Sequence, residues 1–168
     1  IIRNEAPEIT NFYILHEGLV ATLDDELIEE DYDDIEEKKF SRTAQKGWLG
    51  IGDKYWITSL IPPKGKEFKT TFDYKNKFRV NFVATEPLEL NSNSSIEDKM
   101  QIIVAAKRVD VIDGYAESLK IDKFDLTIDW GFLYFITKPL FFGIDYFFKL
   151  LGNYGLAIIA ITICIRLA

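Results

Sequence analysis

The C-terminal end of the chain sets the strongest constraint on its fold. From Leu150 to Ile165 the sequence carries no formal charge, and Arg166 then follows close to the last residue. A bilayer core of about 30 Å is spanned by about 20 residues of helix. The run therefore predicts the start of a transmembrane helix, residues 153–168, in a chain that we expect to be a fragment.

Residues 129–152, just before this run, predict an interfacial amphipathic helix. Lys138, Asp145 and Lys149 fall within about 40° of each other on a helical wheel, and aromatic side chains cover most of the rest. Rings of this kind settle at the headgroup boundary, whereas Pro139 is expected to kink or restart the helix. A buried core helix stays open as the alternative. The candidate membrane-interface residues are Trp130, Phe132, Tyr134, Phe135, Phe141, Phe142, Tyr146, Phe147 and Phe148.

Arg166 is the candidate functional residue of the tail. Counted from Asn153, thirteen residues of helix place it about 20 Å deep, beyond the bilayer midplane. An arginine near the centre costs at least about 2.5–3.5 kcal/mol to insert, so it needs water, a partner or a route to the far interface. Two readings follow: Arg166 reaches out to the far headgroups, or it lines a hydrated cavity within the membrane.

Composition excludes several classes of function. The formal charge of −7 over 168 residues leaves no basic stripe for nucleic acid. Cys164 is the single cysteine, which excludes an internal disulfide and any multi-cysteine metal site. His16 is the single histidine, which excludes a two-histidine metal or acid–base site. We therefore expect no catalytic residue, no metal and no cofactor.

Residues 24–37 form an acidic run in which ten of fourteen side chains are Asp or Glu. Like charges repel and resist packing, so the run predicts a solvated, mobile loop. A calcium site is the sharper alternative, but the alternating oxygen ligands and central glycine of an EF-hand loop are missing.

Residues 1–120 read as a β-rich domain that ends in a helix. The alternation of large apolar and polar residues predicts a hairpin whose aromatic face is core. Apolar residues at helical spacing predict the closing helix, and residues 121–128 read as a linker. The fold class is therefore mainly β, consistent with a sandwich, followed by C-terminal helices. The predicted segments are a strand-prone stretch within residues 1–23 (12–15, then Leu19 and Val20), a strand at 48–52 entering a tight bend, the hairpin 68–74 and 78–84, a buried strand at 100–106 and the helix 109–119.

Four segments together resemble the YidC/Oxa/Alb family of membrane protein insertases, in its bacterial YidC branch. They are Gly47-Trp-Leu-Gly-Ile-Gly-Asp-Lys-Tyr-Trp-Ile-Thr-Ser-Leu-Ile-Pro62, Asp129-Trp-Gly-Phe-Leu-Tyr-Phe-Ile-Thr-Lys-Pro-Leu-Phe-Phe142, Gly152-Asn-Tyr-Gly-Leu-Ala-Ile-Ile159 and Ile165-Arg-Leu167. The resemblance implies that residues 1–128 are the C-terminal portion of a large periplasmic domain, a twisted β-sandwich similar to mutarotase folds. It also implies that the protein lies in the bacterial inner membrane.

The resemblance further implies a function that needs no covalent step. Arg166 matches an arginine that the family places in a hydrophilic groove, where segments of nascent membrane proteins are received. The implied partners are nascent membrane proteins, Sec translocon components and lipid, with no small-molecule substrate and no enzyme activity. The alternative is a membrane-tethered periplasmic carbohydrate-binding or mutarotase-like module, against which the single His16 counts.

Overall fold

The structure is a computed structural model that describes residues 1–7, 16–131 and 133–167. The first part of the predicted strand-prone stretch, residues 12–15, and the interface candidate Phe132 lie outside these residues. Its second part, Leu19 and Val20, is confirmed as strand within Gly18–Leu23. The chain divides into two compact units, Ile1–Asp129 and Trp130–Ala168.

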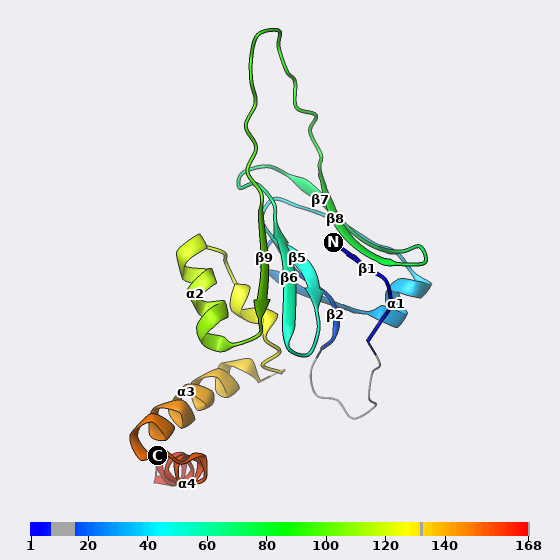
Figure 1. The fold of residues 1–168 in the computed structure, drawn as a ribbon. Coiled ribbons are helices and arrows are strands. Elements are labelled where there is room, and N and C mark those ends of the chain that lie inside the picture. Colours follow the sequence, from blue (N-terminus) through cyan, green and yellow to red (C-terminus); the bar gives the residue numbers. More distant parts are fainter. Residues whose placement is uncertain (8–15, 132, 168) are drawn as a thin grey trace. The chain divides into compact units, whose positions relative to one another are not determined.

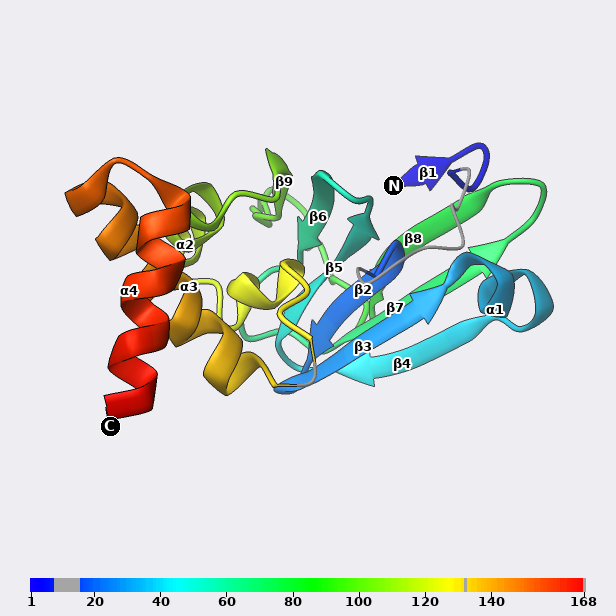
Figure 2. The same ribbon diagram turned by 90° about the horizontal axis from the view of Figure 1, so that it is seen from below.

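The first unit is built from two antiparallel sheets (Figures 1 and 2). One has the strand order β1-β8-β7-β4, and the other has the order β3-β2-β5-β6-β9. This arrangement, with the helices that follow it, confirms the predicted mainly β fold with C-terminal helices. The strands are β1 (Ile2–Arg3), β2 (Gly18–Leu23), β3 (Glu26–Asp31), β4 (Phe40–Ala44), β5 (Gly47–Gly52), β6 (Trp56–Ile61), β7 (Phe68–Tyr74), β8 (Phe78–Ala84) and β9 (Gln101–Ala106).

The central strands of the five-stranded sheet are buried on both faces, and all six residues of β2, including the polar Thr22, are buried. Leu19 and Ala21 face the other sheet, whereas Val20 between them faces the opposite way, as the two-residue period of a strand requires. On that opposite face, Trp48 of β5 packs edge-on against Phe124 with ring centroids 5.4 Å apart.

A helical layer covers this outer face (Figure 1). It consists of α2 (Val109–Leu119) and the short 3₁₀ helix η1 (Phe124–Thr127). The predicted helix at 109–119 is confirmed, and its buried Ile112 explains the helical spacing of its apolar residues. Residues 121–128 also contribute to the core, because Ile121 and Phe124 are both buried.

The predicted hairpin and the predicted bend are both confirmed. β7 pairs with β8 so that Phe72 faces Val80 and Tyr74 faces Phe78, and the aromatic face of the hairpin lies in the sandwich core. β5 approaches its neighbour closely at Gly50, where an added Cβ would lie 2.3 Å from the backbone oxygen of Thr58.

The prediction of a solvated loop at residues 24–37 is wrong. The run forms β3 and the helix α1 (Tyr32–Glu37). Three apolar side chains, Ile28, Tyr32 and Ile35, are buried in the sandwich core. Their burial outweighs the repulsion of the acidic side chains, which remain largely solvated on the outer side.

The prediction of a buried strand at 100–106 is only half right. Ile103 and Ala105 of β9 are buried under the helical layer. Ile102 and Val104, which alternate with them, are 61% and 63% exposed. The reason is that β9 is the edge strand of the wider sheet.

The second unit is a helical hairpin of α3 (Tyr134–Leu151) and α4 (Tyr154–Leu167). Gly152, with a φ of 66°, ends α3, and its amide donates to the Phe148 carbonyl over 2.8 Å. The Phe148 ring then stacks on Tyr154 at 3.8 Å. The helices approach closely at Gly143, where an added Cβ would lie 2.8 Å from a methyl carbon of Ile161.

Candidate membrane-contact surface

The aromatic side chains of α3 form the candidate membrane-contact surface. They remain accessible within the described part of the chain, and successive rings meet edge to face, as in Phe141–Phe142 and Tyr146–Phe147. Large apolar side chains in such numbers at a surface mark a contact with a partner or a membrane. The most exposed of the predicted interface residues are Tyr134, Phe135, Phe141, Phe142 and Tyr146.

Trp130 precedes α3 rather than belonging to it, because the helix begins at Tyr134 and Gly131 has a φ of 71°. Its ring meets Phe141 edge-on with centroids 5.6 Å apart. The Lys138 ammonium lies 5.8 Å from the centre of the Trp130 ring, a cation–π contact. The structure thus brings together residues that the sequence placed eight and eleven positions apart.

The polar side chains of α3 also pair as their spacing suggests. The Lys149 ammonium lies 2.6 Å from the Asp145 carboxylate, one helical turn away. Pro139 lies inside α3, so the helix continues through it.

Arg166 lies in the last turn of α4 and is exposed. The polar groups before it are satisfied locally: Thr162 Oγ1 donates to the Ile158 carbonyl over 2.6 Å, and Asn153 Oδ1 accepts from the Leu156 amide over 3.2 Å. Arg166 is therefore the charged group at the end of an otherwise apolar helix.

Within residues 1–7, 16–131 and 133–167, none of the helices has both the length and the apolar content needed to cross a bilayer.

Asp129, where the chain leaves the sandwich, contacts His16, and the sequence analysis did not connect these two residues. The backbone amide of His16 donates to Asp129 Oδ2 over 2.9 Å, although 113 positions separate them. His16 Nδ1 lies 3.2 Å from the Asp31 carboxylate. The imidazole packs over Gly18, where an added Cβ would lie 2.9 Å from the ring. No sequence signal pointed to this contact, because its partners have no shared motif or periodicity.

Two more charged side chains belong to this neighbourhood. Glu29 is exposed, but neighbouring protein atoms remove part of the hydration of its carboxylate and raise its pKa. Its negative neighbours Asp129 and Asp31 act in the same direction, whereas His16 and Lys107 oppose the shift. Burial lowers the pKa of Lys107, against the opposing effect of Asp53 and other carboxylates. These are the shifts expected for ions that are partly removed from water.

In the part of the chain that the structure describes, no three His, Cys, Asp or Glu side chains are placed to hold a metal ion. The chemistry offered by the tail is therefore a wide aromatic surface and an exposed guanidinium.

Comparison with known proteins identifies related sequences. A family model for the YidC periplasmic domain matches residues 1–142. The chain is 76% identical over 168 residues to the membrane protein insertase YidC of Pelagibacter ubique, covering 100% of this chain and 30% of that protein. It is 37% identical over 172 residues to the insertase YidC of Agrobacterium fabrum, covering 99% of this chain and 29% of the relative. The insertase YidC of Rickettsia prowazekii is 39% identical over 162 residues, which is 92% of this chain and 29% of the relative.

The chain thus spans less than a third of the length of these relatives. The match over residues 1–142, and the identity that continues to the end of the chain, show that it belongs to the bacterial YidC family.

Proposed function

We propose that the protein containing this chain is a membrane protein insertase and chaperone, which assists the insertion and folding of inner-membrane proteins with or without the Sec translocon. The observation that carries the proposal is Arg166 at the end of α4, a helix that is otherwise uncharged and that follows the aromatic helix α3. The names of the relatives, all membrane protein insertases, support it.

In the proposed mechanism, α3 lies at the headgroup boundary and α4 begins to cross the bilayer. The two Tyr rings of α3 suit this boundary because each combines an apolar ring with a hydroxyl that reaches water. The Phe rings of the same helix add apolar area that is buried toward the acyl chains. Asp145 and Lys149 neutralise each other over 2.6 Å, which lowers the cost of placing the helix close to lipid.

Arg166 would line a hydrophilic groove formed with helices beyond this chain. A polar or acidic segment of a client protein loses its hydration when it enters a bilayer, and this loss is the main barrier to crossing. A hydrated guanidinium attracts such a segment and keeps water beside it. The apolar part of the client then partitions into lipid. No bond is made or broken, so the proposal needs no catalytic residue and no cofactor.

Complementation by the full-length protein carrying this sequence tests the role of Arg166. Arg166→Lys is expected to retain partial activity, because the charge remains, and Arg166→Ala to lose insertion of at least some clients. Lys99→Glu, in an exposed loop of the sandwich, is the matched control and should support normal growth. Normal growth with Arg166→Glu would contradict a role for the positive charge.

We also propose that the sandwich docks on Sec translocon components, while the helices contact lipid and nascent membrane proteins. Photo-crosslinking from the sandwich and from α4 in the full-length protein separates these contributions. Crosslinks to Sec components from α4 alone would contradict a docking role for the sandwich.

The carbohydrate-module alternative gains no support from the position of His16. Its Nδ1 faces Asp31 at 3.2 Å and its Nε2 is buried, so the imidazole is poorly placed to exchange protons with a bound sugar. Faster interconversion of aldose anomers on adding the chain would revive this alternative.

A further inference from the structure

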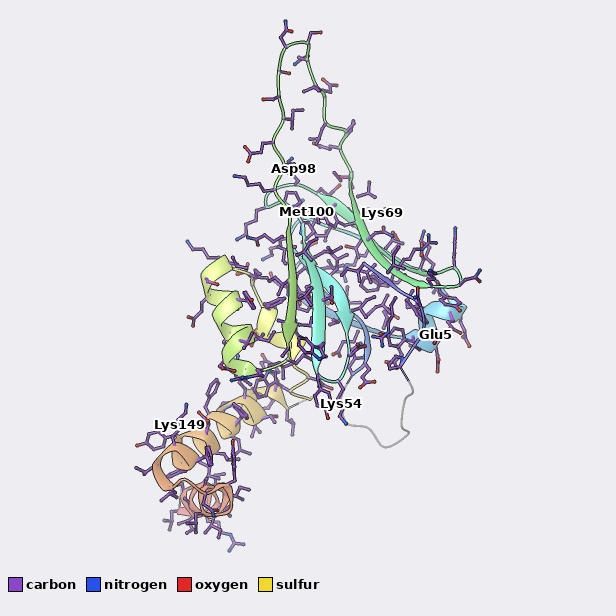
Figure 3. The ribbon with its side chains drawn as sticks, in the orientation of Figure 1. Glu5, Lys54, Lys69, Asp98, Met100 and Lys149 are labelled. Atoms are coloured by element: carbon purple, nitrogen blue, oxygen red, sulfur yellow. The ribbon has the colours of Figure 1, made fainter. Side chains whose placement is uncertain are left out.

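The turn between β5 and β6 carries two large aromatic side chains that are not part of the core. Tyr55 is 66% exposed and Trp56 is 58% exposed. The preceding Lys54, labelled in Figure 3, places its ammonium 5.3 Å from the centre of the Tyr55 ring. We call residues 54–56 the aromatic tip.

The backbone holds the aromatic tip in one conformation. The Asp53 amide donates to the Trp56 carbonyl over 2.8 Å, which closes the turn. The Lys107 amide, just beyond β9, donates to the Tyr55 carbonyl over 2.8 Å. The two exposed rings are therefore presented by a braced turn rather than by a loose loop.

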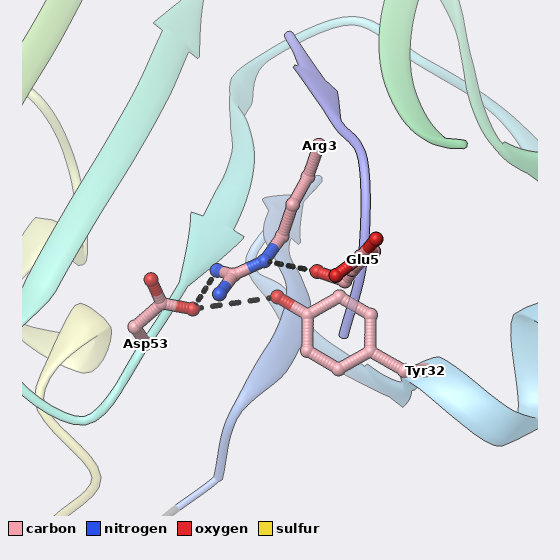
Figure 4. Close-up of polar contacts among 4 residues, drawn as sticks. All are labelled: Arg3, Glu5, Tyr32 and Asp53. Carbon is pink, nitrogen blue, oxygen red and sulfur yellow. Dashed lines mark hydrogen bonds and ion pairs between the residues drawn. The ribbon is translucent and has the colours of Figure 1, made fainter. Parts of the chain in front are cut away.

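Side chains fix the base of the same turn (Figure 4). The Arg3 guanidinium pairs with the Asp53 carboxylate, and Tyr32 donates its hydroxyl to Asp53 Oδ1 over 3.4 Å. Arg3 also donates from Nε to the Glu5 carbonyl over 2.8 Å and lies 5.5 Å from the centre of the Tyr32 ring. Burial raises the pKa of the Tyr32 hydroxyl, so it remains a hydrogen-bond donor.

The aromatic tip lies at the end of the sandwich from which the chain continues toward α3. Gly52, the last residue of β5, pairs with Gly18, the first residue of β2. His16 lies two residues before Gly18 and holds Asp129, the last residue of the first unit. The exposed loop of residues 85–100 lies at the opposite end (Figure 1).

We propose that the aromatic tip is a second membrane contact of this protein, made with the headgroup boundary of a lipid bilayer. The inference rests on the proposed interfacial role of α3, because the chain runs from the tip's end of the sandwich into that helix. Tyr and Trp are the side chains that favour this boundary, and Lys54 reaches a lipid phosphate from beside the Tyr55 ring. Carboxylates of Glu17, Glu29, Asp53 and Asp129 lie near Lys107 in this region, so the rings rather than net charge provide the attraction.

Tryptophan quenching by brominated lipid tests the proposal in the full chain. The vesicles contain phosphatidylethanolamine with a smaller share of phosphatidylglycerol, brominated near the glycerol end of the acyl chains. Trp48→Phe with Trp130→Phe leaves Trp56 as the single fluorophore. Its emission is expected to shift to the blue and to fall by roughly half, because the indole enters the headgroup boundary.

Two further variants provide the controls. Trp48→Phe with Trp56→Phe leaves Trp130, which reports on the membrane contact of the tail. Leu90→Trp, with all three native tryptophans replaced by Phe, places a fluorophore at a 65% exposed position at the other end of the sandwich, and it should not be quenched.

The outcomes separate the two proposals. Quenching of Trp130 without quenching of Trp56 overturns the aromatic tip and leaves the interfacial helix standing. Equal quenching at positions 56 and 90 would show that the sandwich adsorbs to vesicles without a preferred end, and it also overturns the membrane contact of the aromatic tip. Absence of quenching at positions 130 and 56 alike overturns both proposals.

Because Trp48 is fully buried, its replacement is a risk to folding. If the Trp48→Phe variants do not fold, Trp130→Phe is compared with the double variant Trp130→Phe plus Trp56→Phe. Trp48 is then present in both proteins and contributes the same background fluorescence. The difference between these two variants gives the Trp56 signal and carries the same expected result.

Discussion

Single residues in the five-stranded sheet set how closely its strands and their neighbours pack. Gly50 lies against the backbone of β6, and Gly18 and Gly52 leave room for the His16 ring and the Lys107 side chain on the same face. The glycine pattern in the sequence predicted the close approach at β5. It did not predict which side chains fill the space, because these come from distant segments.

Gly50→Ala is expected to destabilise the first unit by about 2–3 kcal/mol, since the new methyl group overlaps the Thr58 carbonyl. Gly114→Ala is the matched control, because nothing lies within 4 Å of an added Cβ at that position of α2. It should stabilise the helix by about 0.5–1 kcal/mol. Denaturant unfolding of both variants measures the difference, and equal effects would contradict the close packing of β5 on β6.

Glu29 gives a pH dependence whose sign follows from its raised pKa. A carboxyl whose pKa is raised by folding binds its proton more tightly in the folded state. Its contribution to the free energy of unfolding is therefore fully present in acid, below its ordinary pKa. This contribution is lost as the pH rises through the raised value. Glu29→Gln is therefore expected to stabilise the protein at neutral pH, by about 0.5 kcal/mol or less because solvent screens the group. The gain should vanish in acid.

Unfolding midpoints measured from pH 4 to pH 8 test this expectation, with Glu117→Gln on the exposed face of α2 as the control. A gain for Glu29→Gln that is the same at every pH would contradict the raised pKa of Glu29.

At the scale of elements, the acidic run shows how a few apolar residues decide a local structure. Ile28, Tyr32 and Ile35 recur at spacings of four and three, which is itself a signal for a buried face. The prediction of a loop followed from the ten acidic residues in the run and did not use the spacing of these three apolar residues. β9 shows the converse, because its apolar sequence predicted burial on both faces and only the position of the strand in the sheet decided otherwise.

Ile35→Ala is expected to cost about 2–4 kcal/mol, because it opens a cavity under α1 where the side chain is now buried. Leu27→Ala on the exposed side of β3 should cost less than about 1 kcal/mol. Hydrogen exchange across β3 and α1 provides the readout. Similar protection in both variants would show that the run is not held by its apolar side chains.

At the scale of the whole molecule, the family, the fold class and the location could be predicted, because long segments of the sequence carry them. The fold confirms the predicted mainly β sandwich with C-terminal helices. The related proteins confirm the YidC family and the predicted location, that of an inner-membrane protein with a periplasmic segment. The pairing of His16 with Asp129 and the bracing of Asp53 by Arg3 could not be predicted, because each joins residues that only the completed fold brings together.

The environment of position 166 tests the central proposal most directly. In the full-length protein with Cys164→Ser, a spin label is attached at Arg166→Cys or at Ile165→Cys, which is 60% exposed and about 100° away around the helix. Collisions with a water-soluble nickel chelate and with lipid-soluble oxygen are then compared in bilayers. If Arg166 lines a hydrated groove, a label at 166 meets the chelate more than oxygen, and a label at 165 does the reverse. A label at 166 that meets oxygen as readily as the label at 165, and is shielded from the chelate, would contradict a hydrated groove.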